Sequence, residues 1–311
     1  MKQRVQVAFA RFWPGFTLEG FLNLLPFLTE EFDLVVSQDP DIVFYSVFVP
    51  QYRPYADPRF SSPAAQFPKG DYVRVFLTGE NVEPLMESCE FAISFSALVR
   101  HPNHMRLPLW AYENQGWGVG LDRLIKRADT DWEKVAAEKT AFCNFVYDHD
   151  MPFRNAIFTE LNRYKRVDAA GRAMNNMDGW RVTKVPNRLI GKLDFLRRYK
   201  FTLSIENTIW PGYTTEKIVD PMFVGSIPIY VGDPLASNTF DPASYVDYTR
   251  FTSIAEMLEF VREVDNDPAL YFKMLAAPNF RGNTIPETVS AKTVSFFFRR
   301  IFAAGLARQR R

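Results

Sequence analysis

A glutamate and a lysine are adjacent at Glu216 and Lys217, in a segment whose pattern could bind an anion. Thr214 or Thr215 can cap a helix that begins near Glu216, so both charged residues are predicted in its first turn. The N–H groups at a helix N-terminus bind anions, whereas a lysine normally favours the opposite end of a helix. Glu216 alone would be an ordinary first-turn residue, because acidic side chains suit the positive end of the helix dipole. Together with Lys217 it indicates a site for an anionic ligand.

Glu206 and Asn207 follow the apolar segment 201–205, which is predicted to be a buried strand. A Trp-Pro-Gly turn at 210–212 leads to the helix, and a second buried strand is predicted at 227–231. The order strand, helix, strand is typical of parallel sheets, in which ligands bind outside the carboxyl ends of the strands. Glu206 and Asn207 could be simple turn residues, but they fall at the edge where the helix N-terminus is expected.

Glu80 and Arg154 are two further candidates for chemistry. Glu80 follows Gly79 after a strand predicted at 73–77, which positions its carboxylate to face a cleft between two halves of the chain. Arg154 stands at the entrance of a predicted amphipathic helix. Taken alone, Glu80 is more often a loop carboxylate with local partners, and Arg154 a solvated first-turn residue.

The segment 199–234 resembles the signature of the α-1,3-fucosyltransferases, glycosyltransferase family 10. The resemblance is carried by Tyr199-Lys200-Phe201, Glu206-Asn207, Gly212-Tyr213-Thr214-Thr215-Glu216-Lys217 and Ile227-Pro228-Ile229-Tyr230, and outside the segment by Thr78-Gly79-Glu80-Asn81, Arg106-Leu107-Pro108-Leu109-Trp110 and Arg154-Asn155. Three positions depart from the family pattern. Ser96 replaces the usual Asp, Val231 replaces a Trp of many bacterial members, and Pro221 lies inside the expected helix, where it removes one backbone donor.

The resemblance implies an α/β fold of GT-B type, with two Rossmann-like domains facing a central cleft. It also implies inverting transfer of L-fucose from GDP-β-L-fucose to a GlcNAc or Glc hydroxyl of an N-acetyllactosamine or Lewis-type glycan, in α-1,3 or α-1,4 linkage. The partners are then GDP-fucose and an oligosaccharide acceptor.

The family's residue roles carry over position by position. Glu80 would be the catalytic base, and Glu216 would lie near the fucose ring. Arg154 and Lys217 would hold the diphosphate of the donor, and Asn207 and Tyr213 would complete the donor contacts. Two alternatives stay open: a transferase of the same fold that uses another nucleotide sugar, and a carbohydrate-binding protein of a membrane surface.

The alternation of predicted strands and helices indicates an α/β fold in both halves. The predicted domains are an acceptor-binding domain over 1–136, a GDP-fucose-binding domain over 137–287 and an amphipathic basic helix over 288–311. Apolar residues gather on one side of that helix and basic residues on the other, which is typical of helices that bind weakly to anionic membranes. The alternative is a helix that packs back on the protein.

The charge balance and the cysteines limit the class of protein. There are 37 basic and 36 acidic side chains, which argues against nucleic-acid binding through overall charge. The two cysteines, Cys89 and Cys143, match neither a disulfide framework nor a zinc motif, so a reducing compartment is expected. No apolar segment approaches twenty residues, and the N-terminus lacks the pattern of a signal peptide. We therefore expect a cytoplasmic protein, on the inner face of the membrane if the last helix binds there.

A bridging metal is not expected to be essential. The nearest Asp-x-Asp element, Asp265-Asn266-Asp267, is predicted to lie in a loop after a helix and away from the signature. Basic side chains and a helix N-terminus could neutralise a diphosphate without a metal or another cofactor.

A further helix is predicted just before the strand at 201–205, with its leucines facing inward and Lys192 and Arg198 facing outward. Basic residues in this position more often form a solvated face than a ligand site.

Overall fold

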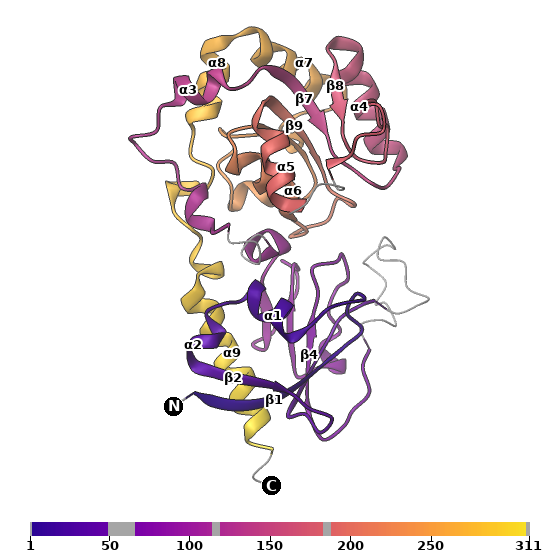
Figure 1. Ribbon diagram of the computed structural model, residues 1–311, viewed down its shortest axis with the longest axis vertical. Coiled ribbons are helices and arrows are strands. Elements are labelled where there is room, and N and C mark those ends of the chain that lie inside the picture. Colours follow the sequence, from indigo (N-terminus) through magenta and orange to yellow (C-terminus); the bar gives the residue numbers. More distant parts are fainter. Residues whose placement is uncertain (1, 49–65, 114–118, 183–187, 309–311) are drawn as a thin grey trace. The chain divides into compact units, whose positions relative to one another are not determined.

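The computed structural model describes residues 2–48, 66–113, 119–182 and 188–308, which belong to two compact units (Figure 1). Unit 1 comprises Met1–Gly120, Pro211–Tyr213 and Ile285–Arg311, and unit 2 comprises Leu121–Trp210 and Thr214–Thr284. The predicted domain ranges were drawn from sequence patterns, and the compact units begin and end elsewhere. The chain leaves unit 1 at Gly120, and its last segment returns to unit 1.

Unit 1 contains a parallel sheet with the strand order β2-β1-β3-β4-β5-β6. Its strands are β1 (Gln3–Ala10), β2 (Phe32–Val36), β3 (Ile42–Tyr45), β4 (Val73–Leu77), β5 (Phe91–Ser94) and β6 (His104–Arg106). Every residue of β3, β4 and β5 is buried, as expected of parallel strands that are covered on both faces. The short helices α1 (Leu18–Leu24) and α2 (Leu28–Glu31) connect β1 to β2.

Unit 2 contains a second parallel sheet with the strand order β11-β10-β9-β7-β8. Its strands are β7 (Ala141–Phe145), β8 (Val167–Ala169), β9 (Tyr199–Ile205), β10 (Ile227–Val231) and β11 (Val246–Asp247). Its helices are α3 (Trp132–Ala137), α4 (Pro152–Tyr164), α5 (Arg188–Arg197), α6 (Glu216–Phe223), α7 (Ile254–Asn266) and α8 (Pro268–Ala276). The α/β fold with parallel sheets is therefore confirmed in both units, and the strands predicted at 73–77 and 227–231 match β4 and β10 residue for residue.

The last helix, α9 (Ala291–Leu306), is part of the core of unit 1 and runs beside its sheet (Figure 1). The ring of Phe302 lies 4.4 Å from that of Phe32, and Arg299 pairs with Glu31 at 2.6 Å. The apolar side of α9 is thus buried, which was the alternative to membrane binding. Within the described residues, no helix combines the length and apolar character that crossing a membrane requires.

Candidate active site

The end of β9 and the start of α6 are tied together by hydrogen bonds at one edge of the unit 2 sheet. Thr215 is the N-cap of α6, and it also donates to Glu206 from its backbone N (2.8 Å) and from its hydroxyl (2.7 Å). Glu206 is buried, and this burial raises the pKa of its carboxyl group. The cap predicted at 214 or 215 is therefore Thr215, and Glu216 and Lys217 lie in the first turn as predicted.

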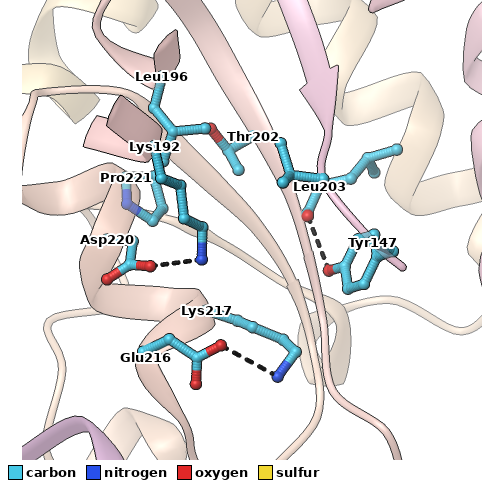
Figure 2. A pocket seen from close by; sticks show the side chains of 10 residues that line it. Tyr147, Lys192, Leu196, Thr202, Leu203, Glu216, Lys217, Asp220 and Pro221 are labelled. Carbon is cyan, nitrogen blue, oxygen red and sulfur yellow. Dashed lines mark hydrogen bonds and ion pairs between the residues drawn. The ribbon is translucent and has the colours of Figure 1, made fainter. Parts of the chain in front are cut away.

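Lys217 lies between two carboxylates. Its Nζ donates to the hydroxyl of Thr215 at 2.9 Å and is 3.4 Å from both Glu206 and Glu216. The Lys217 and Glu216 side chains, 16% and 19% exposed, line a hollow beside α6 (Figure 2). The pair that the sequence singled out is thus held together at the surface of a small pocket.

Pro221 lies inside α6, yet the helix continues to Phe223. A proline at this position cannot donate to the carbonyl of Lys217, four residues earlier. The hydroxyl of Ser204 on β9 donates to that carbonyl instead, at 2.8 Å. The backbone bond that Pro221 lacks is therefore replaced by a side chain, which also fixes the first turn of α6 to β9.

Lys192 on α5 contradicts the prediction that it faces outward. Its Nζ lies 2.5 Å from Oδ2 of Asp220 on α6, and the two side chains are 22% and 1% exposed. Both line the same hollow as Glu216 and Lys217 (Figure 2). The prediction failed because α5 packs on α6, where a buried carboxylate needs a cation. The available sequence signal was Asp220, a carboxylate among the buried positions of α6. It indicated that a cation would pair with it, but not which lysine.

Arg154 is buried in the first turn of α4. Its Nε donates to the carbonyl of Ile205 at 3.1 Å, and its Nη2 donates to the side-chain oxygen of Asn207. The guanidinium also lies 4.3 Å from the ring centre of Tyr147, another residue of the hollow. The structure therefore brings Arg154 and Asn207 together at the end of β9.

Tyr213 belongs to unit 1, where its buried ring meets that of Phe95 edge-on at 5.2 Å. Gly212 before it has a φ of +89°, and a Cβ there would lie 2.6 Å from the carbonyl oxygen of Phe95. Arg106 donates to the carbonyls of both Phe95 and Gly212. The Gly-Tyr element is thus packed on the segment after β5, and a role for Tyr213 in donor binding stays a prediction.

Glu80 lies in unit 1 after β4, where its backbone N donates to the hydroxyl of Thr78 at 3.0 Å. A Cβ on Gly79 would lie 2.8 Å from Cδ1 of Leu109, so a larger residue here requires the Leu109 side chain of the Arg-x-Pro element to shift. Burial, with the charges of neighbouring glutamates including Glu80, raises the pKa of Tyr112. The candidates for donor binding all belong to unit 2: Arg154, Asn207, Glu216 and Lys217. The role of Glu80 as the catalytic base for the acceptor hydroxyl stays a prediction.

Ser96 has a local structural role at the position of the family's Asp. It is buried, and its hydroxyl accepts from the backbone N of Leu98 at 3.1 Å. The hydroxyl therefore closes a turn after β5.

The two aspartates of the Asp265-Asn266-Asp267 element make structural contacts. The element was predicted in a loop, but Asp265 and Asn266 belong to a helix. Asp265 lies in the last turn of α7, where it binds Lys200 at 2.9 Å and Lys165 at 3.0 Å. Asp267 caps α8 by accepting from two backbone N–H groups. Within the described ranges, no group of three or more His, Cys, Asp or Glu side chains is placed to hold a metal ion.

Comparison with known proteins gives matches in both halves. Residues 7–112 match the family model of the alpha-(1,3)-fucosyltransferase N-terminal domain, and residues 135–279 match the C-terminal model of glycosyltransferase family 10 (fucosyltransferase). An alpha-(1,3)-fucosyltransferase of Helicobacter pylori is 26% identical over 87% of this chain, which spans 59% of that relative's length. A putative fucosyltransferase of Acanthamoeba polyphaga mimivirus is 32% identical over 45% of this chain and 24% of its own length.

A crystal structure of an alpha1,3-fucosyltransferase with GDP-fucose matches 97% of this chain and 91% of its own, with a TM-score of 0.74 and 25% identity. The fold is therefore the GT-B type that was predicted. With matching family models over both halves, the chain belongs to glycosyltransferase family 10, the fucosyltransferase family.

Proposed function

We propose that the protein transfers L-fucose from GDP-β-L-fucose to a GlcNAc or Glc hydroxyl of an N-acetyllactosamine or Lewis-type glycan, with inversion and in α-1,3 linkage. The observation that carries this proposal is the Glu216-Lys217 pair in the first turn of α6, together with Arg154 of α4, which donates to the carbonyl of Ile205 at the end of β9. The family, and a similar structure that contains GDP-fucose, support the choice of donor. The name of the H. pylori relative supports the linkage.

In this mechanism the acceptor hydroxyl attacks C1 of fucose while Glu80 takes its proton. The bond between C1 and the diphosphate oxygen breaks, and GDP leaves with the electron pair. Lys217 and Arg154 stabilise the departing charge, and a charge-assisted hydrogen bond to phosphate contributes about 1.5–3 kcal/mol. The Glu216 carboxylate stabilises positive charge that develops on the sugar, and Asn207 holds the Arg154 guanidinium by accepting from it.

The test is product analysis with the purified protein. GDP-fucose is supplied with a panel of N-acetyllactosamine and Lewis-type acceptors, and the linkage of each product is determined by NMR. Formation of an α-1,3-fucosylated product is expected. A product linked only through another hydroxyl contradicts the regiochemistry, and hydrolysis of GDP-fucose without transfer contradicts the acceptor class.

Two alternatives are decided by further arms of the same experiment. A donor screen with other GDP- and UDP-sugars separates fucosyl transfer from transfer of another sugar by the same fold. Vesicle flotation tests a carbohydrate-binding protein of the membrane surface. The burial of the apolar side of α9 in unit 1 argues against this second alternative.

A further inference from the structure

The ion pair between Lys192 and Asp220 lies at one side of the hollow beside α6. Asp220 is 1% exposed, and its Oδ2 lies 2.5 Å from Nζ of Lys192. Bringing two charges out of water carries a large desolvation cost, so a buried pair contributes little net stability. Its place in the pocket suggests that the pair serves the chemistry there.

Asp220 lies four residues after Glu216 on α6, so the two carboxylates lie one turn apart on the same side of the helix. Lys192 reaches this side from α5, and all three residues line the same hollow (Figure 2). The bond from Lys192 to Asp220 therefore holds α5 against the same side of α6 from which Glu216 projects.

The negative charges around Glu216 show why Lys217 alone does not balance the Glu216 carboxylate. Lys217 is shared, at 3.4 Å from Glu206 and 3.4 Å from Glu216. The end of β9 thus contributes a negative group, Glu206, and α6 itself contributes Asp220. The 3₁₀ helix Leu121–Leu124, which also packs on α6, directs Arg123 to the ring of Phe223 at the far end of the helix. Lys192 on α5 adds a second cation that acts on Glu216 in the hollow beside α6.

We propose that Lys192 is a positioning residue for Glu216: it fixes α6 through Asp220 and, with Lys217, keeps the Glu216 carboxylate ionised. The benefit to catalysis rests on the proposed function, since it requires that Glu216 stabilise positive charge on the sugar. Electrostatics agree with the geometry. Burial raises the pKa of Glu216, but the charges of Lys217 and Lys192, with hydrogen bonds from the backbone and Thr215, outweigh burial and lower it below the ordinary glutamate value. Reciprocally, burial lowers the pKa of Lys192, and the charges of Asp220 and Glu216 outweigh this effect and raise it.

The experiment compares three variants. Lys192→Met removes the charge, and Lys192→Arg keeps it. Lys200→Met is the matched control, because Lys200 is 28% exposed and binds the 2% exposed Asp265 at 2.9 Å, outside the pocket. The control thus removes one lysine of a buried ion pair in the same unit without touching Glu216, and Asp265 keeps its second partner, Lys165.

The first measurement is a carbon-13 NMR titration of the Glu216 carboxyl group in the unliganded protein, with Glu216→Gln used for assignment. In the wild type, Lys192→Arg and Lys200→Met, Glu216 should titrate well below the ordinary glutamate value of about 4.3. In Lys192→Met the pKa should rise by at least about one unit, a tenfold change in proton affinity. If Lys192→Met unfolds because Asp220 loses this partner, the double variant Lys192→Met with Asp220→Asn avoids the buried charge. It is compared with Asp220→Asn alone, so that the two proteins differ only at residue 192, and the Glu216 pKa should be higher in the double variant. An unchanged titration in the folded variant overturns the proposal.

The second measurement is transfer and GDP binding. Lys192→Met should lower kcat and move the acidic limb of its pH profile to higher pH, while the Kd for GDP changes less than about threefold. A Kd weakened more than about tenfold, with an unchanged Glu216 titration, would make Lys192 a direct phosphate ligand and refute a positioning role. If the wild type transfers no fucose, the proposed function fails, but the NMR titration still decides the role of Lys192.

Discussion

Ser204→Ala should weaken the attachment of α6 to β9, because the Ser204 hydroxyl replaces the backbone donor that Pro221 lacks. The substitution leaves the half-buried carbonyl of Lys217 without that bond. One hydrogen bond of this kind contributes about 0.5–1.5 kcal/mol to the free energy of unfolding, so the expected cost is about 1 kcal/mol. Because the carbonyl lies in the first turn of α6, GDP affinity should fall with stability.

The matched change is Pro221→Ala, which supplies a backbone N–H four residues after Lys217. In that background Ser204→Ala should cost little, because the new N–H can bind the same carbonyl. The double-mutant cycle should therefore give a coupling of about 1 kcal/mol in favour of the double variant.

Urea titrations give the free energy of unfolding of the wild type, the two single variants and the double variant. Calorimetry gives the affinity of each protein for GDP. If Ser204→Ala costs the same free energy with and without Pro221, the hydroxyl does not replace the missing backbone bond and the reasoning is refuted.

Further predictions concern the base, the metal, the helix α9 and a half-buried histidine. Glu80→Gln should lower kcat by at least about 100-fold with little change in GDP affinity, whereas Lys217→Ala should weaken GDP binding itself. Calorimetry with GDP and steady-state rates distinguish the two effects. Transfer by Glu80→Gln at a near wild-type rate would place the base elsewhere. Transfer should survive EDTA, and complete loss that Mn²⁺ restores would show that a metal is needed. A chain that ends near Ser290 should be insoluble or strongly destabilised, because α9 supplies core residues of unit 1; a stable truncated protein that no longer floats with vesicles would instead favour membrane binding. Burial lowers the pKa of His104 from 6.5 to about 4, so the free energy of unfolding should fall by about 2–3 kcal/mol between about pH 7 and pH 4.5 as the unfolded state takes up a proton, and His104→Gln should lose this part of the pH dependence.

The elements that could be predicted are those whose pattern is local. The strand 227–231 is a continuous apolar run and 73–77 is apolar apart from Arg74, and they match β10 and β4 respectively. The cap of α6 was predicted because a threonine hydroxyl accepts from backbone N–H groups a few positions ahead, which depends on nearby residues alone.

The features that were missed depend on packing between elements distant in sequence. The pairing of Lys192 with Asp220 requires α5 to lie against α6, and helical periodicity cannot distinguish a solvated lysine from one that reaches a buried carboxylate. Likewise, the amphipathic pattern of α9 gave its apolar side but not the surface that covers it, which is the core of unit 1. The replacement of a helix bond by Ser204 across β9 and α6 had no sequence signal for the same reason.

The placement of α9 fixes an order of events during synthesis. The strands of unit 1 leave the ribosome before unit 2, but the helix that packs on Phe21 and Phe32 leaves after the whole of unit 2. Since domains fold as units as their residues emerge, unit 2 can complete its sheet while unit 1 still lacks one side of its core. The half of the protein that is translated first is therefore completed second. Translation that stops between residues 285 and 305 would leave a folded unit 2 joined to an open unit 1.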